Sequence, residues 1–339
     1  MNERQNIILE FIKNHPDSSS SETVNYISKI FPDKNSRPTI IRDIDFLLSE
    51  GKIIKTGSGR STVYSAVIDI DSYFAVDMDK RKLISDYFNF DIWNKTQNLF
   101  SQNELDELEL INAQYRKNIS KLPPASLKKE IERLTIEFAW KSSKIEGSTY
   151  TLLDTEKLIK DKIEAEGKDK SDAIMILNHK AALDFIFKEP EYFTELSVSK
   201  IEYIHKLLTG ELGIASGIRQ RRIGITGTNY RPLDNQFKIK EALETLTTHI
   251  NNMKHPLEKA LAAVLLLSYI QPFEDGNKRT SRTVANALLL AFEYCPLSYR
   301  SVDEIEYKKG MILFYEQNDF KFFKNLFISQ FKMAVDKYF

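Results

Sequence analysis

The residues best suited to chemistry are concentrated in one short stretch, from Gln271 to Arg282, which reads QPFEDGNKRTSR. It combines a proline, a Gly-Asn pair, an acid and two arginines. Gly276 and Asn277 can adopt positive φ, so backbone N–H groups can turn inward there at the start of a helix. Helix N-termini with free N–H groups attract anions, and phosphates above all.

Charged side chains around this turn extend the same chemistry. Asp275 is a hard oxygen ligand suited to Mg²⁺, while Arg279 and Arg282 can neutralise phosphate oxygens. The residues therefore predict a site for a polyphosphate with its Mg²⁺. A helix-helix turn with solvated charges is the alternative, and it explains the Gly-Asn pair alone better than it explains the whole cluster.

Two apolar segments must position this turn. The one from Leu261 to Ile270 is hydrophobic all round, which predicts burial. The one from Val284 to Phe292 is rich in Ala and Leu, the strongest helix formers. Pro272 ends the first helix. We expect two buried helices joined by the charged turn.

The stretch resembles the signature of the Fic family, H-P-F-x-[D/E]-G-N-[G/K]-R-x-x-R. The matching positions are Pro272, Phe273, Asp275, Gly276, Asn277, Lys278, Arg279 and Arg282. Fic enzymes typically transfer AMP from ATP to a hydroxyl of a target protein. The resemblance therefore implies ATP and Mg²⁺ as cofactors and a protein substrate, with the chain itself as one candidate.

The resemblance also implies a role for each matching residue. Asp275 would hold Mg²⁺, and Gly276 and Asn277 would form the phosphate-binding turn beside Lys278. Arg279 and Arg282 would bind the β- and γ-phosphates. Such transfer needs charge neutralisation and in-line positioning more than covalent chemistry.

The one departure from the signature is Gln271, which stands where the family carries histidine. Glutamine has no basic lone pair near neutral pH, and loss of a general base typically costs about 10²–10⁴-fold in rate. Three interpretations stay open: an active enzyme trapped by an introduced glutamine, a natural pseudoenzyme that binds nucleotide, or altered chemistry.

Lys278 and Arg282 bear on the interpretation of altered chemistry. In some family members a lysine at the position of Lys278 accompanies phosphotransfer with the nucleotide reversed. Arg282, however, matches the AMP-transferring pattern. We expect AMP transfer as the ancestral chemistry and little or no activity in the chain as it stands.

A second motif ends a helix expected over about 127–147. Ser142, Glu146 and Gly147 are in register with the Fic inhibitory-helix motif [S/T]-x-x-x-E-[G/N], which this segment resembles. Taken alone, Gly147 is a helix C-cap and Glu146 a surface acid, although an acid near a helix C-terminus opposes the macrodipole. The resemblance implies that Glu146 pairs with Arg282 and excludes the γ-phosphate, so that the protein is autoinhibited.

Residues 222–232 place a Gly-Thr-Asn turn between two extended pieces. This pattern predicts an exposed β-hairpin whose backbone edge could hold an extended peptide. It resembles the Fic flap, which positions the target side chain over the active site. The predicted target-docking residues are Thr226, Gly227, Thr228, Asn229 and Tyr230.

Residues 1–65 predict three short helices followed by a hairpin of residues 52–55 and 61–65. This pattern resembles the winged helix-turn-helix domain, which implies double-stranded DNA or protein as a partner. The basic residues around the third helix and on the wing are Lys34, Arg37, Arg42, Lys52, Lys55 and Arg60. Nine Lys/Arg against eight Asp/Glu leave a net charge of only plus one, and Asp43 and Asp45 lie on that third helix.

The whole chain therefore predicts a mainly α protein. We expect a winged-helix domain at 1–68 (α+β), a helical connector at 69–125, and a helical Fic core with one β-hairpin flap at 126–339. A different class of function also stays open, a DNA-binding regulator whose Fic domain only senses nucleotide. A homodimer is among the assemblies that the sequence leaves open.

Composition bounds the compartment. The 339 residues are 42% hydrophobic and 28% charged with a formal net charge of zero, so no global field favours nucleic acid or membrane. A single cysteine fits a reducing compartment. The first residues lack the apolar run of a signal peptide, and no segment approaches about 20 apolar residues. We expect a cytoplasmic protein with no membrane contact.

Overall fold

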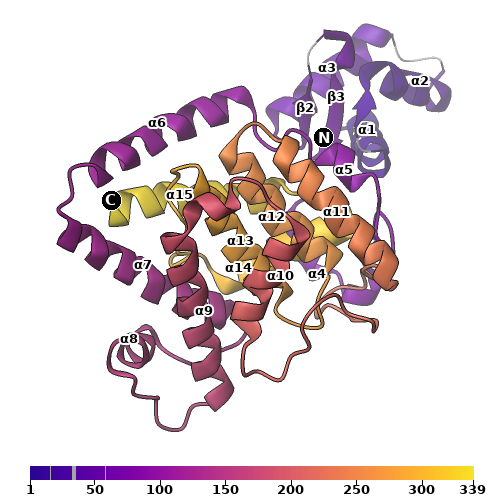
Figure 1. Cartoon of the computed structure of the whole chain (residues 1–339). Helices are drawn as coiled ribbons and strands as arrows, with labels where there is room; N and C mark the ends of the chain where they lie inside the picture. The colour runs from indigo at the N-terminus through magenta and orange to yellow at the C-terminus, as the bar shows by residue number, and fades with distance from the viewer. Residues whose placement is uncertain (16, 33–35, 58) are drawn as a thin grey trace. The chain divides into compact units, whose positions relative to one another are not determined.

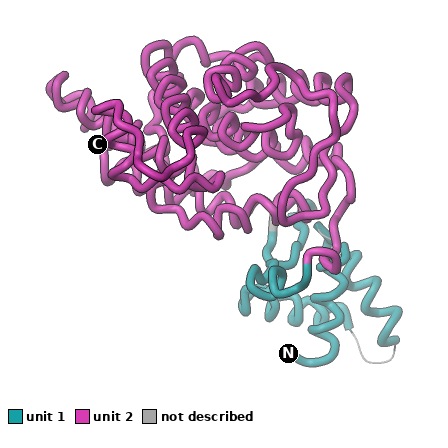
Figure 2. The backbone as a smooth tube through the Cα atoms, turned by 90° about the horizontal axis from the view of Figure 1, so that it is seen from below, with its two compact units in different colours: residues 1–77 teal, residues 78–339 magenta. Residues whose placement is uncertain are grey.

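The computed structural model describes residues 1–15, 17–32, 36–57 and 59–339. The chain divides into two compact units, Met1–Asp77 and Met78–Phe339 (Figure 2). Each unit has a hydrophobic core of its own, and each is described by itself.

The first unit contains short helices and a small antiparallel sheet in the order β1-β3-β2. Its elements are α1 (Glu3–Asn14), β1 (Ser18–Ser19), α2 (Ser20–Ile30), α3 (Arg37–Ser49), β2 (Ile53–Thr56), the 3₁₀ turn η1 (Gly59–Ser61), β3 (Val63–Ala66) and α4 (Ile70–Ala75). The three expected helices and the hairpin are confirmed, with Ile53 opposite Ala66 and Thr56 opposite Val63. That the unit is a winged helix stays a prediction.

Asp43, one of the two acids that the sequence places on the third helix, is buried on α3. Its side chain points into the unit, where it accepts a hydrogen bond from Gln5 Nε2 at 2.9 Å and pairs with Arg4. Only 6% of the residue is exposed. The reason is the helical period, because Asp43 follows Ile40 and precedes Ile44 and Leu47 on the buried stripe. Lys34 lies outside the described residues, as does the side chain of Arg60.

The second unit is almost entirely helical (Figure 1). Its elements are η2 (Met78–Lys80), α5 (Ile92–Lys95), α6 (Gln102–Ile119), α7 (Pro124–Ile145), α8 (Leu152–Asp161), α9 (Lys170–Lys188), η3 (Pro190–Phe193), α10 (Val198–Thr209), α11 (Gln236–Asn252), α12 (Pro256–Ile270), α13 (Asn277–Ala291), α14 (Glu304–Gln317) and α15 (Lys321–Tyr338).

Helices α12 and α13 form the centre of this unit and pack against each other, with α10 and α11 beside them (Figure 1). Every residue from Leu261 to Ile270 is at most 1% exposed, as the apolar sequence predicts. The charged turn 271–276 connects the two helices, so its backbone is anchored at both ends in the core.

The predicted β-hairpin at residues 222–232 is wrong. The segment has a turn at Thr226 and Gly227, but among the described residues its two sides do not pair as strands. Tyr230 instead inserts into the core, where it stacks on Tyr269 with ring centroids 4.5 Å apart and donates to the Tyr269 carbonyl at 2.9 Å. The next residue, Arg231, donates its backbone N–H to the Asp86 carbonyl.

A connecting segment, residues 78–89, thus takes the place of the missing hairpin partner. Arg81 donates to the Gly227 carbonyl at 2.7 Å and pairs with Glu316 on α14. Asn229 donates to the Met78 carbonyl at 3.3 Å. The second side of residues 222–232 is therefore fixed to this connector.

Within the described part of the chain, no helix combines the length and apolar character needed to cross a membrane.

Candidate functional site

The turn between α12 and α13 opens with a strained residue. Gln271 caps α12 in the left-handed region, with φ 51° and ψ 60°. A side chain there costs about 1–2 kcal/mol, so the surrounding structure must hold it in place. The residue is 6% exposed, and its amide nitrogen donates to the Ser268 carbonyl at 2.7 Å.

Asn277 and Phe273 fix the middle of the turn. The Asn277 side-chain oxygen accepts from the Phe273 N–H, and its amide nitrogen donates to the Phe273 carbonyl, both at 2.8 Å. The Phe273 ring stacks on His205 with centroids 3.8 Å apart. The turn is thus rigid before any ligand binds.

Gly276 forms the N-cap of α13 at φ 79°, a conformation that favours glycine. A Cβ at this position would lie 3.1 Å from Thr209 Cγ2 and 3.4 Å from an Arg279 nitrogen. Among the described residues, the backbone N–H groups of 277–279 donate to no protein acceptor. These open N–H groups at a helix N-terminus form an anion-binding geometry.

Arg282 is completely buried and is bound on three sides. Its Nη2 donates to Glu146 Oε1 at 2.8 Å and to the Ser142 carbonyl at 3.0 Å. Its Nη1 lies 3.4 Å from the Tyr307 hydroxyl, and its Nε donates to Ser142 Oγ at 3.0 Å. Glu146 is the C-cap residue of α7, where Gly147 ends the helix at φ 106°. The structure brings together two motifs 136 residues apart.

Three cations surround the Glu146 carboxylate. Burial acts to raise its pKa, but Arg282, Lys278 and Arg279 outweigh that effect and hold the pKa below its usual value. This environment explains how an acid can lie at a helix C-terminus, since the nearby cations offset the unfavourable macrodipole.

A hydrogen-bond chain supports Arg282 from behind. A guanidinium can only donate, so Ser142 Oγ accepts from Arg282 and directs its own proton to His179 Nε2 at 2.8 Å. His179 Nδ1 lies 2.8 Å from the Met175 carbonyl and therefore carries the ring proton. Burial, with Arg279 nearby, lowers the pKa of His179 to about 3, which keeps the ring neutral.

Asp275 and Arg279 form a pair one turn apart, with Oδ2 and Nη2 at 3.1 Å. The Asp275 side chain is 70% exposed, whereas Arg279 is almost buried. Within the described residues no group of three or more His, Cys, Asp or Glu could hold a metal ion by itself. A cation here would therefore share the single Asp275 carboxylate with oxygens of a bound ligand, an arrangement that suits Mg²⁺.

These side chains line a cavity of about 280 Å³. Its lining residues are Glu146, Ser171, Met175, Leu212, Ile214, Asp275 and Arg279. One wall is charged and the other apolar, as expected of a pocket for a small molecule that carries an anionic group.

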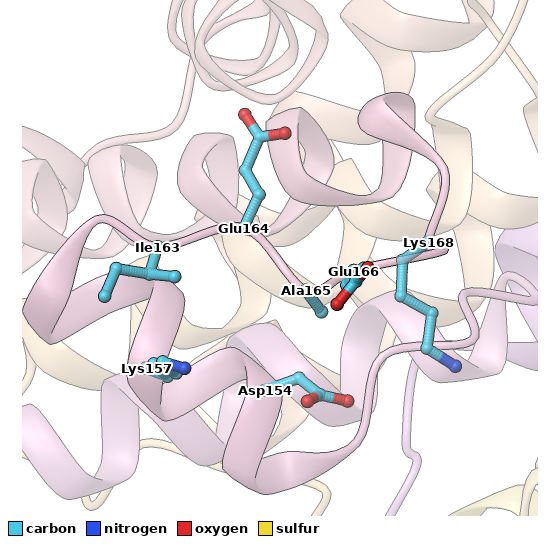
Figure 3. A pocket seen from close by; sticks show the side chains of 7 residues that line it. All are labelled: Asp154, Lys157, Ile163, Glu164, Ala165, Glu166 and Lys168. Carbon is cyan, nitrogen blue, oxygen red and sulfur yellow. The ribbon is translucent and has the colours of Figure 1, made fainter.

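A second cavity, of about 310 Å³, lies beside α8 (Figure 3). Its lining residues are Asp154, Lys157, Ile163, Glu164, Ala165, Glu166 and Lys168. The Asp154 carboxylate accepts from the Thr151 N–H and hydroxyl, and Lys168 donates to the Thr149 carbonyl. Glu164 points away from both (Figure 3). Its charges are of both signs, and two of them, Asp154 and Lys168, already have hydrogen-bond partners.

The five predicted flap residues divide into buried and exposed positions. Thr228 and Tyr230 are buried, Gly227 is half-buried, and Thr226 and Asn229 are exposed. No hydrogen bond or ion pair joins these five to residues 275–282 within the described chain. They lie instead against α12, α14 and the connector.

The sequence patterns missed three residues at this site. Tyr307 contacts Arg282, His205 Nε2–H donates to the Asp275 carbonyl, and Arg219 donates to the Gln271 carbonyl. Each lies on an ordinary helical or loop position far away in sequence, so no local spacing could have found them.

Comparison with known proteins identifies part of the second unit. Residues 195–289 match the sequence model of the Fic/DOC family. A protein adenylyltransferase Fic of Nematostella vectensis is 26% identical over 212 residues, which cover 61% of this chain and 49% of that protein. One from Drosophila grimshawi is 27% identical over 176 residues, covering 51% and 36%. The chain thus spans about a third to a half of these curated relatives.

Solved structures share the fold. Fic-1 of C. elegans (residues 134–508) aligns with a TM-score of 0.60 at 14% identity, covering 99% of this chain and 98% of that one. A Fic domain containing signaling protein of Bacteroides thetaiotaomicron aligns with a TM-score of 0.57 at 21% identity, covering 68% and 94%. The charged turn lies inside the segment 195–289 that matches the Fic/DOC family model.

Proposed function

We propose that the chain is a Fic-type nucleotidyltransferase that binds ATP and is held inactive by its own Glu146. The observation that carries the proposal is the pair of buried Arg282 with Glu146 beside the open N-terminus of α13. An arginine with no exposure is costly unless paired, and here its partner is a carboxylate that lines the cavity. A phosphate oxygen could accept the hydrogen bond from Arg282 Nη2 that Glu146 Oε1 accepts.

The roles follow from charge and position. The open N–H groups of Asn277, Lys278 and Arg279, after the Gly276 cap, would receive the phosphates. The side chains of Arg279 and Arg282 would neutralise the phosphate charge. Asp275 would hold Mg²⁺, which supplies charge neutralisation between the phosphates when bound. On binding, the ion pair between Asp275 and Arg279 would open. Asp275 would then hold the metal ion, and Arg279 would contact a phosphate.

Autoinhibition in this proposal is competition for one guanidinium. Glu146 already occupies the Arg282 donors and places a negative charge where a γ-phosphate would lie. Ser142 and Gly147 support it, the first by holding Arg282 and the second by ending α7 next to Glu146.

The transfer step needs a base that Gln271 cannot supply. The target hydroxyl oxygen would attack the α-phosphorus, the bond to the β-phosphate oxygen would break, and pyrophosphate would leave. The hydroxyl proton needs an acceptor near position 271. A glutamine there leaves the three interpretations in place: an introduced block, a natural pseudoenzyme, or phosphotransfer favoured by Lys278.

The domain bounds and the docking of a target protein are part of the same proposal. The Fic core would cover residues 126–339, after a connector at 69–125. Residues 226–230 would dock a protein target. They belong to the segment 222–232, whose second side contacts residues 78–89, so the target would lie along its first side. The target is a hydroxyl-bearing protein segment, on another protein or on a second copy of this chain.

Labelled-nucleotide transfer tests the proposal. Four chains are incubated with Mg²⁺ and ATP labelled at the α- or γ-phosphate: the unmodified chain, Gln271→His, Glu146→Gly, and both changes together. We expect the double variant to label itself or a lysate protein from α-labelled ATP, and the unmodified chain to do so at least about 10²-fold more slowly.

The two labels separate the alternatives. Label from γ-labelled ATP alone would replace AMP transfer by phosphotransfer. A double variant that binds ATP yet transfers neither label rejects the transferase proposal and leaves a nucleotide-binding pseudoenzyme.

A second candidate function is a DNA-binding regulator whose Fic domain senses nucleotide. The inward orientation of Asp43 supports it, because one of the two acids expected on α3 no longer opposes phosphate contact. Arg37 and Arg42 remain on the exposed side of the helix. These cations suit contacts to a phosphate backbone.

Gel-shift titration of the full chain on duplex DNA at low salt tests this candidate. Arg37→Glu with Arg42→Glu should abolish binding, whereas Lys128→Glu with Lys129→Glu, exposed positions of the second unit, should not. A response of the shift to ATP would favour the regulator. No affinity for duplex DNA at low salt removes it.

A further inference from the structure

Arg219 is a buried arginine without a carboxylate partner. Only 2% of the residue is exposed, and within the described chain no acid lies within ion-pair distance of it. Its guanidinium donates instead to three main-chain carbonyls. Nε reaches Gln271 at 2.7 Å, Nη1 reaches Arg221 at 2.8 Å, and Nη2 reaches Leu233. Asp234 acts on Arg219 from beyond ion-pair distance, but burial outweighs this effect and lowers the pKa of the guanidinium, so holding the charge on main-chain carbonyls is unfavourable.

A second observation points to the same place. The Arg219 backbone N–H donates to the Pro272 carbonyl at 2.9 Å, next to the Gln271 carbonyl that its side chain grips. Gln271 is the residue held in the left-handed conformation. Backbone strain of this kind persists only where neighbours over-determine it, and it gathers at functional sites.

The other two carbonyls lie at the two ends of residues 222–232. Arg221 immediately precedes that segment and Leu233 follows it. One guanidinium therefore joins three pieces of chain: the strained turn after α12, the start of the flap segment and its end. None of its contacts reaches the phosphate-binding N–H groups of 277–279.

We propose that Arg219 is a positioning residue that holds position 271 in register with the flap segment while leaving nucleotide binding to the turn at 275–282. The predicted effect on transfer rests on the proposed function. The structural part of the inference is the clamp, meaning the bonds from Arg219 to the carbonyls of Gln271, Arg221 and Leu233. The clamp can be tested even if the proposed function fails. A planar fork with five fixed donors can satisfy three carbonyls at once, which a lysine cannot do.

The test uses the double variant Gln271→His with Glu146→Gly as parent, because that chain is expected to transfer. We expect Arg219→Met to lower the transfer rate at saturating ATP by at least about 100-fold, since a small misplacement of a reacting group has that effect. Arg219→Lys should retain part of the rate. The dissociation constant for ATP should change by no more than about twofold.

Arg116→Lys is the matched control. Arg116 also donates to main-chain carbonyls, of Phe292 and Glu293, but on an exposed face away from the turn. It should leave both transfer and ATP affinity unchanged. An Arg219→Met chain with full transfer would overturn the inference, as would a loss of ATP affinity equal to the loss of rate.

Hydrogen exchange separates this inference from the proposed function. If the parent transfers nothing, the proposed function fails, and the clamp is then tested in the unmodified chain. Arg219→Met should speed amide exchange in residues 219–233 and 271–275 by more than tenfold, with little change in α6. Arg219→Lys provides the same measurement if the methionine variant does not fold. Unchanged exchange in both segments would reject the clamp.

Discussion

At the scale of single residues, the site depends on positions where the substitution of one side chain would disturb the turn or leave a charge unpaired. Gly276 is the clearest, because its positive φ and its close neighbours leave no room for a side chain. Glu146 and Arg282 depend on each other in a different way, since removing Glu146 leaves the fully buried charge of Arg282 without its carboxylate partner.

We expect Gly276→Ala to lower the free energy of unfolding by about 1–3 kcal/mol, because the left-handed backbone disfavours a Cβ and Thr209 Cγ2 would lie 3.1 Å away. Urea unfolding measures the change. Gly210→Ala is the matched control. Its φ of −53° suits alanine and its nearest neighbour would lie 3.8 Å away, so the control should be neutral or slightly stabilising. Equal effects of the two substitutions would contradict this description of the turn.

At the scale of elements, the segment 222–232 has its shape from anchoring instead of strand pairing. Tyr230 inserts between Tyr269 and Tyr315, and the connector 78–89 takes up its second side. The segment is therefore held by α14 and by α12, the helix that leads into the charged turn.

Tyr230→Phe should lower stability by about 1 kcal/mol, because the Tyr269 carbonyl loses its buried hydroxyl donor. Amide exchange in residues 222–232 should also accelerate. Tyr203→Phe, at a side chain that is 38% exposed, is the control and should change neither. If the two substitutions behave alike, the hydroxyl does not anchor the segment.

The sequence predicted these elements unequally, for physical reasons. The buried helices around 271–282 followed from apolar runs, and Asp275 and Arg279 from the chemistry of their side chains beside the Gly-Asn pair. The meeting of Glu146 with Arg282 came only through resemblance, since no local pattern joins residues so far apart. The hairpin failed because Tyr230 is drawn into the core, and Arg219 escaped notice because its partners are carbonyls, which carry no sequence signal.

At the scale of the whole molecule, buried histidines link stability to pH. Burial lowers the pKa of His179, His205, His249 and His255. Below about pH 6.5 the unfolded chain therefore takes up protons that the folded chain does not, so folding weakens as the pH falls. For His179 this continues to about pH 3.

We expect the urea midpoint to fall steadily between pH 6.5 and 5, with each such histidine contributing at most about 1.4 kcal/mol per pH unit. Glu146 acts in a lower window, because its depressed pKa gives stability that is lost only in stronger acid. His179→Gln should flatten the slope, and His15→Gln, at an exposed position, is the control. A midpoint independent of pH over this range would contradict the assignment of buried neutral rings.

The central claim is that Glu146 blocks an ATP site at Arg282. Its most direct test is the affinity for ATP with Mg²⁺, measured by calorimetry on the unmodified chain and on Glu146→Gly. Releasing Arg282 should tighten binding at least tenfold, about 1.4 kcal/mol. Adding Arg282→Ala should remove the gain, while Glu164→Gly, in the cavity beside α8, should have no effect. If the Glu146→Gly chain binds ATP no better than the unmodified chain, or not at all, the site is not an autoinhibited nucleotide site.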